Sequence, residues 1–386
     1  MAKIADAFSL IRNGANIKQG LDDSGYPITR IETISDRTVD RDKMGYAGIT
    51  DITKYSDYVL QDGDILMSHI NSETHLGKVA RYEKYEGETI IHGMNLLCLR
   101  PNKNLVDSRY AFYYLSSEAF LHQIPRITKK SVNQASFNVA ALKELTFPIS
   151  SMEVQQTVAD ILDKANELIA LRKEQLAKLD ELVKARFVEL FGDPVYNSKR
   201  LPIQRLCKLG SLDRGRSQHR PRNDPKLLNG PYPLIQTGEV ASAGLYITKY
   251  KNTYSELGLR QSKMWSAGTL CITIAANIAQ TAILTFDACF PDSVVGFLPN
   301  DSINAIYMHY WFGFFQKILE KQAPQVAQKN INLKILSELN VIVPTQEKQE
   351  QFAAFVEQTD KSKVAIQKAL DEAQLLFDSL MQKYFG

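Results

Sequence analysis

The sequence lacks the closely spaced cysteines of a disulfide-rich domain or a structural zinc site. Its four cysteines are scattered along the chain and form no Cys-x-x-Cys pair: Cys98, Cys207, Cys271 and Cys289. Such spacing favours free thiols and a reducing compartment. The N-terminus also lacks the apolar run of a secretory signal peptide, because Lys3, Asp6 and Arg12 interrupt it. We therefore expect a cytoplasmic protein.

Long hydrophobic runs and a strong net charge are missing as well. Gly268 to Phe286 is fairly apolar, but polar residues such as Asn277 and Gln280 interrupt it, so we predict buried strands there and no membrane span. The formal net charge is only +3 over 386 residues. A surface that binds nucleic acid therefore has to come from local basic segments. The apolar fraction of 44% is sufficient for real hydrophobic cores.

The sequence contains no motif that marks a catalytic centre. There is no Gly-rich phosphate-binding loop, no His-Glu-x-x-His motif and no recognisable pair of catalytic carboxylates. Asp193-Pro194-Val195-Tyr196 is similar to the (Asn/Asp/Ser)-Pro-Pro-(Tyr/Phe) loop of adenine methyltransferases, but valine replaces its second proline. Because this segment follows Gly192, we interpret it as a helix terminator. His69 and His75 lack a third metal ligand and are expected to be ordinary surface or groove residues.

What the sequence does contain is an internal repeat. Glu153-Val154-Gln155-Gln156 recurs as Glu347-Lys348-Gln349-Glu350, and Phe191-Gly192 recurs as Phe385-Gly386. The offset is 194 residues in both cases (347 − 153 and 386 − 192). Similarity at such a long, fixed period indicates that the chain consists of two copies of one structural unit.

Both copies of the repeated stretch have the apolar spacing of a long helix. Apolar residues follow three- and four-residue steps, which is the heptad pattern of helices that pack on each other. The residues predicted to pair the helices are Leu162, Ile169, Leu176, Leu179, Val183, Ile366, Leu370, Phe377 and Leu380. Ser150 to Glu153 is a candidate capping box, and Gly192 with Pro194 is a stop signal. We predict helices at residues 151–192 and 347–386.

The segments before the two helices carry matching anchors in otherwise different sequences. Tyr110-x-x-Tyr113-Tyr114 has a counterpart in Tyr307-x-x-Tyr310-Trp311, and Gln134-x-Ser136-Phe137-Asn138 has one in Gln328-x-Asn330-Ile331-Asn332. Strand-like runs such as Asp64 to Ile70 alternate with polar turns. We therefore predict an α+β fold in which two globular mixed domains, residues 1–150 and 193–346, are separated by the two helices.

The repeat also constrains how the two helices are arranged. If they pair side by side while each globule keeps the same position on its helices, the helices have to be antiparallel. The two halves are then related by a pseudo-two-fold axis, with the globules at opposite ends of a helical rod. In this arrangement Gly386 is expected to return near Met1.

Basic and amide side chains gather locally in both globules. Arg and Lys neutralise phosphates, and Arg, Asn and Gln also pair with base edges in the major groove. A solvated loop explains one such run equally well, but its occurrence in both globules favours nucleic acid. The predicted DNA-binding residues are Arg37, Arg41, Lys43, Lys129, Lys130, Asn133 and Gln134 in the first globule, and Arg214, Arg216, His219, Arg220, Arg222, Lys249, Lys251, Gln328 and Lys329 in the second.

Two different globules alternating with two similar heptad helices resemble the specificity subunit of a type I restriction–modification system. The resemblance covers essentially the whole chain. Its most specific marks are the motifs at 134–138 and 328–332, the Glu-x-Gln helix starts at 153 and 347, and the Phe-Gly helix ends at 191 and 385. The combination is more specific than any one of these motifs.

The resemblance implies a division of labour between this chain and its partners. Each globule would be a target-recognition domain that reads one half of a split DNA sequence, and the helices would space the two domains and dock two methyltransferase subunits. Those subunits would bind S-adenosylmethionine and methylate adenine at N6, and further restriction and translocase subunits would cut unmodified DNA. The chain itself would be non-catalytic and would need neither a cofactor nor a metal.

Two other classes of protein remain as alternatives. A stand-alone DNA adenine methyltransferase or nuclease is disfavoured because its motifs are absent from the sequence. A coiled-coil adaptor that does not touch nucleic acid would explain the helices but not the basic residues. A methylation assay with the chain alone separates the first class from a DNA-reading subunit, and a gel shift with duplex DNA separates the second.

Overall fold

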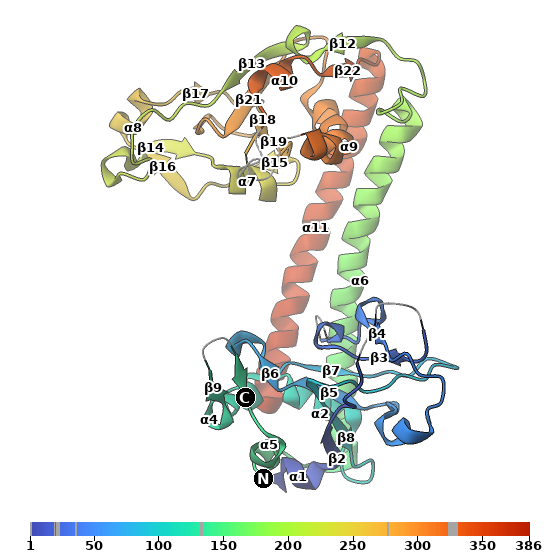
Figure 1. The fold of residues 1–386 in the computed structure, drawn as a ribbon. Helices are drawn as coiled ribbons and strands as arrows, with labels where there is room; N and C mark the ends of the chain where they lie inside the picture. Colours follow the sequence, from blue (N-terminus) through green and yellow to red (C-terminus); the bar gives the residue numbers. More distant parts are fainter. Residues whose placement is uncertain are drawn as a thin grey trace. The chain divides into compact units, whose positions relative to one another are not determined.

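The computed structural model describes residues 2–18, 20, 24–34, 37–131, 134–275, 278–322 and 331–386, with the backbone alone at 317–322 (Figure 1). The chain forms two compact units. Unit 1 consists of Met1–Lys173 and Lys368–Gly386, and unit 2 consists of Glu174–Gln367. Each unit thus combines one globule with one half of each long helix, a division that cuts across the four predicted segments.

The two long helices are α6 (Met152–Phe191) and α11 (Gln346–Phe385), each with 40 residues. The prediction of two long helices is confirmed, but the predicted capping box is wrong. Ser151 is the residue before α6, and its Oγ accepts a 3.4 Å hydrogen bond from the N–H of Val154, so valine occupies the position that the box assigns to glutamate. Gly192 ends the helix in the left-handed conformation, with φ +76°. No helix among the described residues has the length and apolar character needed to cross a membrane.

Within unit 2 the helices run antiparallel. The rings of Phe187 and Phe191, at the end of α6, lie 5.4 and 5.5 Å from the ring of Phe352, near the start of α11. Asp180, which precedes Phe187 on α6, forms an ion pair with Lys363, which follows Phe352 on α11. The two helices therefore run in opposite directions. The antiparallel pairing expected from the repeat is therefore present in this unit.

Within unit 1 the first half of α6 and the last half of α11 share one hydrophobic core. Of the residues predicted to pair the helices, Leu162, Ile169 and Phe377 are buried in this core, and Leu370 and Leu380 pack against it. Val183 is buried in the core of unit 2. The remaining three are only half-buried and belong to no hydrophobic cluster: Leu176, Leu179 and Ile366. The predicted placement of the two globules along the helices stays a prediction.

The globule of unit 1 is built on an antiparallel sheet with the strand order β2-β8-β5-β7. The strands are β1 Ala2–Lys3, β2 Phe8–Asn13, β3 Pro27–Ile28, β4 Gly45–Tyr46, β5 Ile65–Ser68, β6 Ile70–Asn71, β7 Val79–Arg81, β8 Leu96–Pro101, β9 Lys129–Lys130, β10 Ala135–Ser136 and β11 Thr146–Phe147. The short helices are α1 Ile4–Ala7, α2 Ser108–Leu115, α3 Glu118–Leu121, α4 Ile124–Ile127 and α5 Val139–Lys143. The apolar runs of β5 and β8 form the middle of the sheet because both of their faces are buried.

The globule of unit 2 contains a five-stranded sheet, β13-β21-β18-β19-β15, and a four-stranded sheet, β16-β14-β20-β17. The strands are β12 Ile203–Arg205, β13 Gly210–Arg214, β14 Leu228–Leu234, β15 Tyr246–Ile247, β16 Asn252–Tyr254, β17 Met264–Trp265, β18 Leu270–Thr273, β19 Thr281–Leu284, β20 Ala288–Cys289, β21 Val294–Pro299 and β22 Asn340–Ile342. The helices are α7 Thr237–Ser242, α8 Glu256–Arg260, α9 Ala305–Gln322 and α10 Leu333–Ser337. The buried strands predicted between residues 268 and 286 are confirmed as β18 and β19.

A buried glutamine ties each long helix to its globule. Gln155 Oε1 accepts the N–H of Asp107 at 3.0 Å, and its Nε2 donates to the carbonyls of Leu105 and Ser150, both at 2.9 Å. In unit 2, Gln349 makes the same three bonds, to the N–H of Asn304 (2.8 Å) and to two carbonyls, those of Ser302 (3.1 Å) and Pro344 (2.9 Å). The Glu-x-Gln motif is repeated because this buried amide bonds three backbone groups in each unit.

Helix caps at equivalent positions complete the shared frame. Asn138 caps α5 by accepting the N–H of Ala141 at 2.8 Å, and Asn332 caps α10 by accepting the N–H of Ile335 at 2.9 Å. Asparagine is favoured at this position because its side-chain oxygen satisfies a backbone donor that lacks a partner within the helix. The two globules therefore present different loops from one framework.

The end of α11 and the N-terminal strand of the globule share the core of unit 1. The ring of Phe385 lies 5.2 Å from that of Tyr110, and Tyr110 also contacts Phe147 at 6.4 Å. Phe147 in turn contacts Phe8 at 5.7 Å. The Phe-Gly helix end is thus a core position of unit 1, as Phe191 is in unit 2.

Candidate nucleic-acid interface

The basic segment, defined as residues 214–222, is held by an extensive set of backbone hydrogen bonds. The N–H of Gly215 donates to Val294 O at 2.8 Å. The N–H groups of Gln218 and His219 both donate to the side-chain oxygen of Gln261, at 2.7 and 3.1 Å. A freely solvated loop would leave these groups to water. The segment is therefore ordered by the globule before any ligand binds.

One aspartate gathers three of the arginines in this segment. Arg214 donates from Nε and Nη2 to the backbone oxygen of Asp292, at 3.0 and 2.7 Å. Arg222 Nη2 lies 2.6 Å from Asp292 Oδ1, and Arg220 Nη2 lies 3.9 Å from Oδ2. Arg220 also donates to the carbonyls of two neighbours in the segment. The structure thus brings these predicted residues together around Asp292, which the sequence pattern did not identify.

Three further predicted residues of unit 2 are exposed: His219, Lys249 and Lys251. His219 Nε2 is 3.1 Å from Asp224 Oδ2. Lys249 and Lys251 are exposed on either side of Tyr250, whose ring packs against Phe286 at 5.3 Å. Gln328 and Lys329 lie outside the described residues.

Lys263 is a further basic residue near the segment, and in the sequence it belongs to a run in which basic and aromatic residues alternate. Its Nζ lies 4.0 Å from the ring centroid of Trp265 and 2.8 Å from Asp213 Oδ2. This ion pair is the main cause that holds the pKa of Asp213 below its usual value.

In unit 1 the structure engages most of the predicted basic residues with acidic partners. Arg41 forms two hydrogen bonds to the Glu88 carboxylate, at 2.9 and 2.6 Å, and its guanidinium lies 3.5 Å from the ring centroid of Tyr85. These bonds to Arg41 are the main cause that lowers the pKa of Glu88 to about 2. Lys43 pairs with Asp40 at 3.0 Å. Arg41 is therefore fixed inside unit 1.

Three further predicted residues of unit 1, Lys129, Lys130 and Gln134, lie at the edge of a small sheet. Lys129 and Lys130 form β9 and are exposed, and Lys130 pairs with Glu73 at 2.7 Å. Gln134 closes the turn between β9 and β10, where its carbonyl accepts the N–H and Oγ–H of Ser131, both at 2.8 Å. Asn133 lies outside the described residues.

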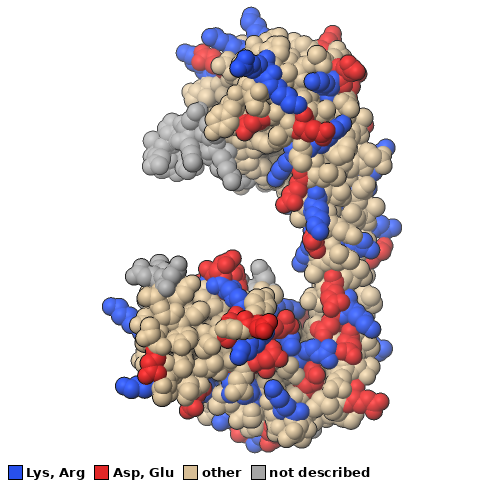
Figure 2. Space-filling model, turned by 90° about the vertical axis from the view of Figure 1, so that its right-hand side faces the viewer, with Lys and Arg blue, Asp and Glu red and all other residues tan. Residues whose placement is uncertain are grey.

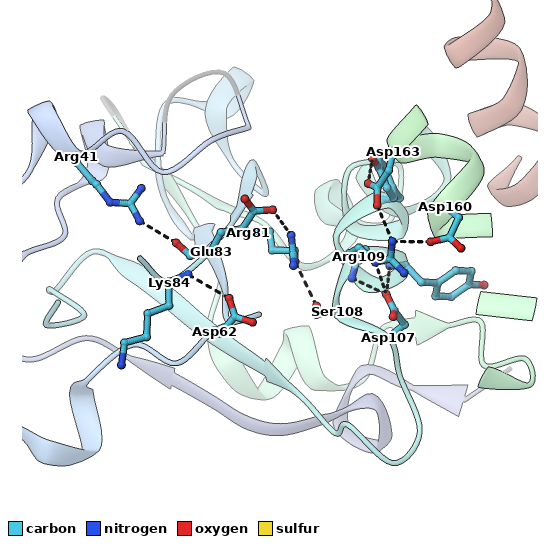
Figure 3. Close-up of polar contacts among 12 residues, drawn as sticks. Arg41, Asp62, Arg81, Glu83, Lys84, Asp107, Ser108, Arg109, Asp160 and Asp163 are labelled. Carbon is cyan, nitrogen blue, oxygen red and sulfur yellow. Dashed lines mark hydrogen bonds and ion pairs between the residues drawn. The ribbon is translucent and has the colours of Figure 1, made fainter. Parts of the chain in front are cut away.

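A polar cleft of about 680 Å³ in unit 1 contains basic residues that sequence reasoning missed. Its lining includes the predicted Arg37 and Arg41 together with Arg81, Arg109 and Lys173. Figure 3 shows Arg109 directed at Asp160 and Asp163 of α6, at 2.7 and 2.8 Å. The two aspartates interrupt the apolar pattern of α6 at a three-residue spacing, and that was the signal for a polar contact on this face.

Charge on the molecular surface is mixed. On the face drawn in Figure 2, Lys and Arg side chains alternate with Asp and Glu over both globules. A uniformly basic face would attract any duplex, whereas isolated basic segments between acidic groups make binding depend on a matching position. This distribution agrees with the small net charge of +3.

The described residues contain no group of three or more His, Cys, Asp or Glu side chains that is able to hold a metal ion. His69 was expected at the surface or in a groove, and this prediction is wrong, because only 6% of the residue is exposed. Burial lowers its pKa, so the ring is held neutral by the surrounding core. His75 lies in a surface turn, 2.8 Å from Ser72 Oγ.

Comparison with known proteins gives a consistent result. The sequence model of the family described as "Type I restriction modification DNA specificity domain" matches residues 1–181 and 206–374. A protein from Methanocaldococcus jannaschii, named as the MjaX specificity subunit of a type I restriction enzyme, is 31% identical over 384 residues. The match spans 95% of this chain and 89% of that protein.

Two solved structures share the fold. The S subunit of the type I restriction–modification system from M. genitalium matches with a TM-score of 0.62 at 14% identity, over 100% of this chain and 95% of that one. A chain from a structure on the complex assembly and conformational transition of a type I R-M system matches with a TM-score of 0.57 at 15% identity, over 100% and 96% of the two chains. At these identities the likeness concerns the fold alone.

Proposed function

Because this chain belongs to the family of type I restriction–modification DNA specificity subunits, we propose that its two globules each read one half of a bipartite DNA target. The observation that carries the proposal is a repeated frame with unlike surfaces. Gln155 and Gln349 make the same three bonds in the two units, while the loops held by the two frames have different sequences. A duplicated framework with divergent loops suits two half-sites of different sequence.

The unlike loops also support a division between the two half-sites. Unit 2 offers the ordered basic segment, and unit 1 offers Lys129, Lys130 and Gln134 on a sheet edge together with Arg37 in a cleft. Arginine and glutamine pair with base edges, whereas lysine mainly neutralises phosphates. Each unit thus has groups for positioning on the backbone and groups for reading bases.

The long helices supply the connection between the reading units and the proposed docking surface for two methyltransferase subunits. Each helix runs without a break from one unit into the other, so its length limits the gap between the half-sites. Both helices expose large apolar side chains: Leu171 and Leu182 on α6, and Val364 and Leu375 on α11. Exposed apolar residues on a helix favour contact with a partner protein.

In this proposal the chain binds and orients DNA and performs no chemical step. The partner methyltransferase subunits bind S-adenosylmethionine and methylate adenine at N6, and restriction and translocase subunits complete the complex in the cytoplasm. The side chains of this chain supply phosphate neutralisation and base contacts, which need neither a metal nor a cofactor.

Purified components test this division directly. The full-length chain is incubated with duplex DNA and labelled S-adenosylmethionine, alone and with its methyltransferase subunits. We expect methyl transfer at defined sites only in the mixture. Methyl transfer or cleavage by the chain alone would support an enzyme. A mixture that methylates without sequence preference would contradict the proposed reading role.

A further inference from the structure

The arginines of the basic segment fall into two groups, and this inference rests on the proposed function. Arg214, Arg220 and Arg222 donate to oxygen atoms of unit 2, mainly those of Asp292. Arg216 differs, because its exposed side chain forms no hydrogen bond or ion pair with any described residue. Three guanidinium groups are thus used to hold the segment. The exposed guanidinium of Arg216 forms no hydrogen bond or ion pair in the described part of the chain, and its charge only contributes to lowering the pKa of Asp213.

The backbone at Arg216 is fixed on both sides. Its N–H donates to Phe290 O at 3.1 Å, and its carbonyl accepts Ser262 Oγ–H at 2.9 Å. Gly215, the residue before it, packs so closely that a Cβ there would lie 2.3 Å from Phe290 O. Ser217, the residue after it, is only 6% exposed. Since the backbone does not have to be ordered on binding, presenting this guanidinium costs the rotamer entropy of its side chain but no backbone entropy.

Such an arrangement suits a base contact better than a phosphate contact. A phosphate needs only a positive charge within reach, which a lysine on a flexible loop supplies. A planar guanidinium with a fixed origin matches the two acceptors, N7 and O6, that guanine presents in the major groove. The surrounding ion pairs explain why the other arginines are unsuited to this task, since Arg222 is already bound to Asp292 at 2.6 Å.

We infer that Arg216 is a specificity-determining residue that reads a guanine in the half-site of unit 2, and that Asp292 is the positioning residue that holds the segment presenting it. Asp292 contacts Arg214 through its backbone oxygen and Arg222 through its carboxylate, on the two sides of Arg216 in the chain. Removing the carboxylate releases the C-terminal side of the segment and leaves the backbone bond to Arg214 in place.

The test measures binding of the full-length chain, assembled with its methyltransferase subunits, to a target duplex and to a scrambled duplex of equal length. Arg216→Lys keeps the charge and removes the paired hydrogen bonds, so target affinity falls on the order of 10-fold while affinity for the scrambled duplex is unchanged. Asp292→Asn lowers target affinity by a smaller factor. The direction of this change in affinity is informative. Removing a negative charge by itself raises the affinity for any DNA, so a loss of target affinity in Asp292→Asn has to come from the lost contact.

Asp301→Asn is the matched control, since Asp301 is an exposed aspartate of the same unit that forms no hydrogen bond or ion pair with described residues. Unchanged target affinity in Arg216→Lys would overturn the reading role. A gain for both duplexes in Asp292→Asn, equal to that in Asp301→Asn, would overturn the positioning role. If the unaltered complex fails to distinguish the duplexes, the proposed function fails and this inference fails with it.

Folding of the variants is checked independently of DNA. Both tryptophans of the chain, Trp265 and Trp311, lie in unit 2, so their fluorescence reports on unfolding of the unit that carries the substitutions. Arg216→Lys alters only an exposed side chain. Its affinities for the target duplex and the scrambled duplex can therefore be compared even if Asp292→Asn is less stable.

Discussion

The two units attach the long helices through the same buried glutamine but surround it with different chemistry. In unit 2 the contact is aromatic, because Phe187 lies 5.4 Å from both Tyr307 and Phe352. In unit 1 it includes a polar network in which Arg109 pairs with Asp160 and Asp163. The comparison teaches that the repeat preserves the glutamine hydrogen bonds and one aromatic pair at the helix end, Tyr110 with Phe385 and Tyr307 with Phe191, while the charged contact at Arg109 belongs to unit 1.

The largest expected effect comes from removing the aromatic contact of unit 2. Phe187 is fully buried and contacts Phe191, Tyr307, Phe314 and Phe352. We expect Phe187→Ala to lower the free energy of unfolding by about 3–5 kcal/mol, because it leaves a cavity in the core. The free energy of unfolding of unit 2 is measured by urea titration, with tryptophan fluorescence as the signal.

Phe377→Ala is the comparison variant for that experiment, because Phe377 is buried in unit 1. It should shift the unfolding midpoint seen by circular dichroism more than the midpoint seen by tryptophan fluorescence. If Phe187→Ala and Phe377→Ala shift the fluorescence midpoint equally, the loss of the aromatic contact is not specific to unit 2.

The two glutamines should have similar effects in spite of their different surroundings. Gln155→Leu and Gln349→Leu each remove three hydrogen bonds between a buried amide and backbone groups that are mostly half-buried, which costs about 3 kcal/mol. Circular dichroism follows unfolding of the whole chain, and tryptophan fluorescence follows unfolding of unit 2. Gln156→Leu, at the exposed neighbouring position, should cost far less. A large loss in Gln156→Leu, or none in Gln349→Leu, would contradict a shared frame.

A smaller and salt-dependent effect is expected for the polar contact of unit 1. Arg109→Met removes two ion pairs to α6, and we expect a cost of about 1–2 kcal/mol at low ionic strength. The loss should shrink between about 0.05 and about 1 M salt, because salt screens charges that are partly exposed. Unfolding of Phe187→Ala provides the salt-independent reference. If salt changes the loss of unfolding free energy equally in Arg109→Met and Phe187→Ala, the polar contact of unit 1 does not differ from the aromatic contact of unit 2.

The last effect is confined to acid pH and concerns the stability of unit 1. Arg41 is the main cause that lowers the pKa of Glu88 from 4.5 to about 2. A carboxyl whose pKa is lower in the folded state stabilises it above about pH 4.5, and the stabilisation is lost as the pH falls towards about 2. Glu88→Gln should therefore flatten the pH dependence of unfolding in this window, whereas Glu86→Gln, at an exposed position, should not. If the free energy of unfolding depends on pH in the same way in the wild type and in Glu88→Gln, the Glu88 carboxylate does not contribute to acid stability.

Much of the frame was predictable because its signals are local in sequence. The heptad spacing gave the two helices, and the repeated motifs gave the positions of Gln155, Asn138 and their counterparts. The interface was less predictable, because its decisive contacts join distant residues. Arg214 binds the carbonyl of Asp292, 78 positions away, and Arg41 binds Glu88, 47 positions away. A count of basic residues does not reveal which of them already have a partner.

The heptad pattern also missed part of the core. Phe187 and Phe191 are fully buried but lie beside the predicted helix-pairing positions, because they contact the globule as well as the other helix. Leu176, Leu179 and Ile366 follow the heptad pattern but are only half-buried and belong to neither of the two large hydrophobic clusters. Periodicity predicts the face that two helices share, and it does not include a third element that packs against them.

Sequencing of DNA methylation in cells that carry the wild-type chain or the Arg216→Ala variant tests the central claim most directly. We predict a two-part methylated motif with an unread gap for the wild type. In the variant, one half should become degenerate while the other half and the gap stay the same. A single continuous motif, or relaxation of both halves by this one substitution, would contradict the account of two units that read DNA separately.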